Sequence, residues 1–113
     1  MLIDTIRMDG NIIVIKPEGS EKGDLNQLAE EIKRFISNEG YNNIVLDLTG
    51  LNLFDGIKVG VLAATYHFIK FINGKIYLVV NNVQVKKSID ILNLSNAVVV
   101  FDKKPFMVQP VTA

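Results

Sequence analysis

Few side chains in this sequence could carry chemistry by themselves, and most of them lie in one stretch, residues 43 to 71. Asp47 and Asp55 are two carboxylates that could converge on a cation, but no other oxygen ligands follow them at a fitting spacing. The chain has no cysteine and a single histidine, His67, so thiolate chemistry is excluded and a zinc site lacks ligands. We expect no bound metal and no cofactor.

The same stretch offers no arrangement for catalysis. His67 stands between Tyr66 and Phe68 in an apolar run, where a histidine is more often a packed side chain than a general base. No serine has an evident basic partner that could activate it as a nucleophile. We therefore expect that the protein is not an enzyme.

Composition narrows the possible partners. The 113 residues are 49% apolar, which fits one globular domain over residues 1–113 with a buried core. Twelve basic residues balance twelve acidic ones without a basic cluster, so binding of nucleic acid is not expected.

The first residues alternate in polarity, which is typical neither of a signal peptide nor of a membrane span. We expect a cytoplasmic protein.

The elements that would position these residues alternate between strand and helix. Two β-type runs, 2–8 and 11–16, flank an Asp-Gly pair that predicts a hairpin, and Asp24 could cap the first helix. Hydrophobic periodicity predicts helices over 25–38, 57–72 and 84–92, and strands over 43–48, 75–80 and 97–101. This order predicts an α/β fold, namely a mixed β-sheet with an N-terminal antiparallel pair and helices mainly on one face.

Four segments in this order resemble the STAS domain, a family named for sulfate transporters and anti-sigma-factor antagonists. They are "IVLDLTGLNLFDG", "VGVLAATYHFIK", "GKIYLVV" and "VQVKKSIDILNLS", and the resemblance extends from about Ile6 to Asp102. It implies a bacterial regulatory domain that binds a partner protein, such as an anti-sigma factor kinase involved in the regulation of transcription.

The sequence departs from this family at the turn where members are phosphorylated. The family pattern there is Asp-Ser-Ser/Thr-Gly-Leu-Gly, and the first Ser is the usual phosphorylation site. Asp55 matches the Asp, Gly56 falls at the phosphorylated Ser, and Lys58 stands where the Gly would be. The resemblance therefore implies a switch position without a hydroxyl. We expect Asp55 to cap the helix by accepting from the N–H of Ile57 or Lys58, and Gly56 to give the turn its freedom.

The helix over 57–72 is apolar nearly all round, so we expect it to be buried on two sides. Docking as in the family would turn one set of side chains toward the sheet, namely Val59, Leu62, Ala63 and Tyr66. The predicted partner-binding site comprises Asp55, Gly56, Ile57, Lys58, Gly60, Val61, Ala64 and Phe68. Its apolar and small members could bind a partner protein or a second copy as a homodimer, or be covered by the chain itself.

Two other functions remain as alternatives to an anti-sigma-factor antagonist. One is a scaffold or transporter-associated STAS protein, because the missing hydroxyl suits a constitutive binder. The other is a degenerate receiver domain of two-component signalling, suggested by Asp47 at a strand end and by Lys104-Pro105-Phe106. A receiver, however, needs an acidic pair after its first strand to hold Mg²⁺, and that pair is missing here.

Overall fold

Strands and helices alternate along the chain after an initial pair of strands. The structure is a computed structural model that describes residues 3–8, 12–17, 25–39, 43–71 and 73–101. Its elements are β1 (Ile3–Met8), β2 (Ile12–Pro17), α1 (Leu25–Glu39), β3 (Asn43–Asp47), α2 (Leu53–Lys70), β4 (Lys75–Val79), α3 (Val83–Asp90) and β5 (Ala97–Val100). Asp24 and residues 104–106 lie outside the described residues.

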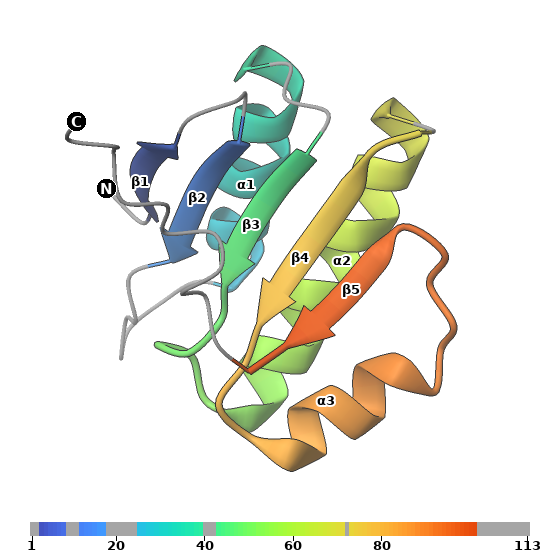
Figure 1. The fold of residues 1–113 in the computed structure, drawn as a ribbon. Helices are drawn as coiled ribbons and strands as arrows, with labels where there is room; N and C mark the ends of the chain where they lie inside the picture. Colours follow the sequence, from blue (N-terminus) through green and yellow to red (C-terminus); the bar gives the residue numbers. More distant parts are fainter. Residues whose placement is uncertain (1–2, 9–11, 18–24, 40–42, 72, 102–113) are drawn as a thin grey trace, which may run out of the picture.

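The strands form one sheet in the order β1-β2-β3-β4-β5 (Figure 1). β1 and β2 run antiparallel, with Ile6 opposite Val14, so no helix follows the first strand as it would in a receiver domain. The pairs β2–β3, β3–β4 and β4–β5 are parallel, which requires the crossovers that α1, α2 and α3 supply. Strand order therefore follows chain order, and β5 forms one edge of the sheet.

The hydrophobic core lies between the sheet and the layer of helices. α1 packs against α2, and α2 packs against α3. Ile44 and Leu46 of β3 point into this core, while the alternate residue Val45 packs with Val79 on the opposite face. Because both faces of β3 are buried, its sequence is a continuous apolar run rather than an alternating one.

The start of α2 differs from the prediction. We expected the helix to begin near Ile57, whereas it begins at Leu53 and contains Asp55 and Gly56 in its first turns. The physical reason is a stronger cap upstream. Asn52 adopts an extended backbone and its side chain accepts a hydrogen bond from the backbone N–H of Asp55 at 2.9 Å.

Candidate functional site

The N-terminus of α2 is held by a reciprocal pair of side chains. The Asn52 side-chain oxygen accepts from Asp55 N–H, and Asn52 Nδ2 donates to Asp55 Oδ2 at 3.2 Å. The backbone N–H of Gly56 donates to Asn52 O at 2.8 Å. Asp55 is therefore the third residue of the helix and not its cap, which corrects the expectation that it accepts from Ile57 or Lys58. The spacing Asn-x-x-Asp was the signal available in the sequence.

Gly56 is a helical residue that faces α3. It is buried, and a Cβ added to it would lie 4.0 Å from Val85 Cγ1, which is ordinary contact. No positive φ requires a glycine at this position. The expected role of Gly56 in a flexible turn is therefore wrong.

Two residues expected on the outer face of α2 lie in the core instead. Ala64 is completely buried, and a Cβ on Gly60 would lie 3.0 Å from Leu48 Cδ1 and 3.1 Å from Ile89 Cδ1. Gly60 thus lets α2 approach the end of β3 and α3 closely, and neither residue can contact a partner. The expected sheet-facing set is right for Val59 and Ala63, which are buried, and wrong for Leu62 and Tyr66, which are half-exposed.

The exposed side of α2 forms one wall of an apolar groove beside α1. This α1–α2 groove has a volume of about 720 Å³. Its two ends carry large exposed side chains, because Phe54 is 78% exposed and Ile69 is 67% exposed. At 1.5 Å per residue these two positions are roughly 22 Å apart along the helix. The lining residues are Lys33, Phe54, Ile57, Lys58, Val61, Leu62, Thr65, Tyr66 and Ile69.

Only part of the predicted site lines this groove. Ile57, Lys58 and Val61 do, whereas Phe68, although 43% exposed, is not among the lining residues. Asp55 lies in the first turn of α2, outside the groove lining. Lys33 of α1 was missed, and so were five residues of α2, namely Phe54, Leu62, Thr65, Tyr66 and Ile69. Together with Ile57, Lys58 and Val61, these positions of α2 recur at spacings of three or four residues. That spacing was a signal, but one that the buried face of an all-round apolar helix shares.

Cationic side chains surround Tyr66 at the edge of the groove. Lys33 Nζ lies 5.8 Å and Lys70 Nζ 5.9 Å from the centre of the Tyr66 ring, both within the range of a cation–π contact. Lys33 also approaches Glu30 at 3.5 Å, and the Tyr66 hydroxyl is hydrogen-bonded to Ser37 Oγ. Lys33 and Lys58 line the groove, and Lys70 lies beside Tyr66, so these three lysines give the apolar groove a basic rim.

Asp47 and His67, which were considered first as candidates for chemistry, are both buried in the fold. Asp47 is buried and its Oδ1 accepts from Thr49 N–H at 3.0 Å and from Thr49 Oγ1 at 2.6 Å. His67 is fully buried, with its ring centre 5.3 Å from that of Phe71. Within the described residues, no three acidic, histidine or cysteine side chains are grouped to hold a metal. Asp47 therefore fastens the loop after β3.

The sequence matches the family model of the STAS domain over residues 23–105. The chain belongs to the STAS domain family. Its fold is similar to the NMR structure of the protein TM1081, with a TM-score of 0.51 and 18% sequence identity, over 88% of this chain and 80% of that one. A comparison with curated proteins gives no match. Among the helices that the structure describes, none has the length and apolar character needed to span a membrane.

Proposed function

We propose that this STAS domain is a non-catalytic regulatory protein that binds another protein through the α1–α2 groove. The observation that carries the proposal is an apolar groove along α2 from Phe54 to Ile69, with lysines at its rim. Such a groove suits an amphipathic helix, whose apolar side chains would lie along Val61 and Leu62. Acidic residues flanking that helix would lie near Lys33 and Lys58.

The partner class that fits the family is an anti-sigma factor kinase or a related regulatory protein, and the protein would act as an anti-sigma-factor antagonist in the bacterial cytoplasm. Gly56 carries no hydroxyl, so this binding would not be switched by phosphorylation at the position usual in the family. Constitutive binding also suits a scaffold or transporter-associated STAS protein, and this is the second candidate function.

A homodimer through α2 is a weaker form of the same proposal. Gly60 and Ala64 are small residues of the predicted partner-binding site that would admit a second helix, but both are buried in the core. Without small residues on the outer face, two α2 helices would have to pack through Phe54, Val61 and Ile69. We therefore favour a different protein as the occupant of the groove.

The test is to add purified anti-sigma factor kinases from the same genome to the isotopically labelled protein and record amide shifts by NMR. We expect shifts along α2 from Phe54 to Ile69 and around Lys33 in α1. The α3 region serves as the internal control. Shifts confined to α3 and β5, or no binding by any of these kinases, would contradict the proposed partner and groove.

A further inference from the structure

A serine near the C-terminal end of α1 contacts α2. Ser37 is exposed and lies third from the end of α1. Its Oγ is hydrogen-bonded to the hydroxyl of Tyr66, a residue that lines the α1–α2 groove. Helix ends open locally at low cost in free energy, so a modifying enzyme that binds an extended backbone can reach Ser37. Thr65 is harder to reach, because it lies within α2 and its Oγ1 donates to Val61 O at 2.8 Å.

Three basic side chains flank this pair of hydroxyls, and they are here called the basic cluster. Lys33 and Arg34 precede Ser37 by four and three residues, so they lie on the same side of α1. Lys70 comes from α2, and its Nζ lies 5.9 Å from the centre of the Tyr66 ring, which Lys33 Nζ approaches to 5.8 Å. Cations from two helices therefore converge on the contact between Ser37 and Tyr66.

Only part of this positive charge is balanced inside the protein. Lys33 Nζ approaches Glu30 at 3.5 Å, and the Glu30 side chain is 64% exposed. Within the ranges that the structure describes, Arg34 and Lys70 take part in no ion pair. The positive charge of the basic cluster therefore exceeds the negative charge of Glu30, and an added anion would be attracted to it.

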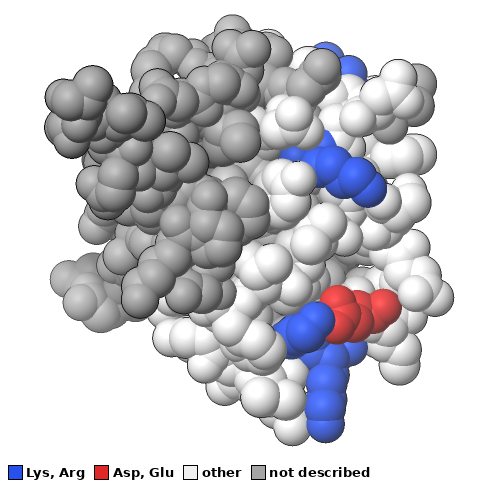
Figure 2. Space-filling model, in the orientation of Figure 1, with Lys and Arg blue, Asp and Glu red and all other residues white. Residues whose placement is uncertain are grey.

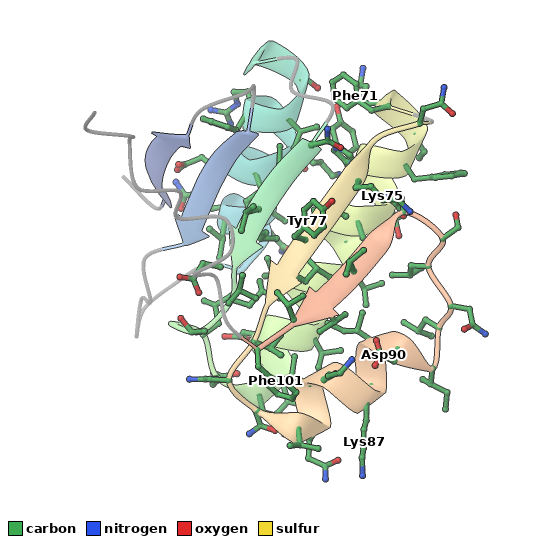
Figure 3. All side chains as sticks on the ribbon, in the orientation of Figure 1. Phe71, Lys75, Tyr77, Lys87, Asp90 and Phe101 are labelled. Carbon is green, nitrogen blue, oxygen red and sulfur yellow. The ribbon has the colours of Figure 1, made fainter. Side chains whose placement is uncertain are left out.

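Ser88 in α3 provides a comparison. Acidic and basic side chains lie next to each other over α3 in Figure 2, where Lys86 Nζ donates to Asp90 Oδ2 at 2.7 Å. Figure 3 shows Lys87 of α3 and Phe71, which directly follows α2, at opposite ends of the molecule. This serine therefore lies among charges of both signs and far from the basic cluster.

We propose that Ser37 is a phosphorylation site whose phosphate is held by the basic cluster and weakens partner binding at the α1–α2 groove. The effect on binding rests on the function proposed above. The phosphoryl donor is ATP and the enzyme is a serine kinase. Ser37 Oγ forms a bond to the γ-phosphorus, and the bond from this phosphorus to the β-phosphate oxygen breaks. The products are phosphoserine, ADP and the proton of the hydroxyl.

The phosphate changes the charge at one end of the groove. It carries about −1.5 to −2 charges at pH 7. Lys70, Arg34 and the Tyr66 hydroxyl donate to its oxygens, which keeps α1 and α2 joined. These contacts also offset the unfavourable position of a negative charge near the C-terminus of a helix. Lys33 and Lys70 are then neutralised in the basic rim, so an acidic partner is no longer attracted to it.

The phosphate site can be tested without a partner. Phosphoserine is introduced at position 37 of the full chain and, as a matched control, at position 88, and both phosphates are titrated by ³¹P NMR. The pKa for loss of the last phosphate proton should be lower at position 37, because the basic cluster favours the doubly charged form. Lys70→Ala should raise this pKa at position 37 alone. Equal pKa values at the two positions, or no change in Lys70→Ala, would overturn the proposal.

Partner binding is measured with the anti-sigma factor kinases that test the proposed function. Phosphoserine at position 37 should weaken their affinity by at least about tenfold, because repulsion replaces attraction at the rim. Phosphoserine at position 88 should leave the affinity unchanged. Equal affinity with and without phosphate at position 37 would overturn the proposed regulation. No binding by the unmodified protein would contradict the proposed function instead, and the titration would still decide the phosphate site.

The modification itself is read by mass spectrometry. Incubation of the full chain with ATP and serine kinases from the same genome should add phosphate to Ser37. Ser37→Ala should lose this signal and keep the parent's melting temperature within a few degrees. Phosphate on Ser88 but not on Ser37, or on neither, would overturn the proposal.

Discussion

Single side chains decide where α2 begins. Asn52 and Asp55 satisfy each other and the first amides of the helix, and this cap brings Leu53 and Phe54 into α2. The expectation from the family pattern placed the helix start at Ile57, because Asp55 matches a residue of the switch turn. Local capping chemistry, which can be read from Asn-x-x-Asp, is the better guide here.

Replacing Asn52 with alanine should lower the free energy of unfolding by about 0.5 to 2 kcal/mol, because the N–H of Asp55 loses its acceptor. Urea denaturation of the purified variant measures this change. Asn52→Ser restores a side-chain oxygen at the cap and should recover most of the loss. Equal losses in the two variants would show that the side-chain oxygen does not cap the helix.

The second prediction at this scale concerns the switch position. Incubation with an anti-sigma-type serine kinase and ATP should leave residues 54–60 without phosphate, because none of them carries a hydroxyl. Mass spectrometry of the proteolysed protein reads this directly. Phosphate on Ser88 or on Ser20 would indicate that the switch has moved, and phosphate on Asp47 after treatment with acetyl phosphate would instead support a receiver-like function.

At the scale of elements, the sequence predicts the kinds and order of elements better than their orientation. Strand runs and helical periodicity are local signals. The structure contains all three predicted helices, although α2 begins four residues earlier than predicted. The orientation of α2 was partly wrong because an all-round apolar helix does not indicate which face meets the sheet. Packing decides it, since Gly60 has no side chain and lets α2 lie close to Leu48 and Ile89.

Two glycine substitutions test this packing. Gly60→Val should reduce the free energy of unfolding by about 1 to 3 kcal/mol, because its side chain would overlap Leu48 and Ile89. Gly56→Ala is the matched control, with room for its methyl group beside Val85. It should stabilise the protein by about 0.5 to 1 kcal/mol through a better helix propensity. Thermal and urea unfolding measure both, and an unchanged Gly60→Val variant would contradict the packing of α2.

For the molecule as a whole, the α1–α2 groove could not be predicted from the sequence because it needs two helices side by side. Val61 and Lys58 were identified from the helix alone, but Lys33 comes from α1 and reaches Tyr66 only after folding. The sequence therefore indicated the correct helix but an incomplete surface. Lys33 joins the predicted Lys58 in the basic rim, and from this rim we infer that the proposed partner is acidic.

This rim predicts a salt dependence. The chain has no net charge, so attraction of an acidic partner must come from local lysines rather than from the whole molecule. The double variant Lys33→Ala and Lys58→Ala should slow association by a few-fold and weaken its dependence on salt. Lys87→Ala, on the side of α3 directed away from β5, is the control and should leave the association rate unchanged. Stopped-flow fluorescence measures these rates.

The most direct measurement of the central claim compares partner affinity in two charged variants of α2. Val61 lines the α1–α2 groove, whereas Phe68 lies on the same helix outside its lining. Val61→Glu should weaken binding of the anti-sigma factor kinase by roughly ten- to a hundredfold, since burying valine contributes about 1.5 to 3 kcal/mol. Phe68→Glu should leave the dissociation constant unchanged, and both variants should keep the parent's melting temperature within a few degrees. Calorimetric titration that finds equal affinities for the parent and the folded Val61→Glu variant would contradict the groove as the binding site.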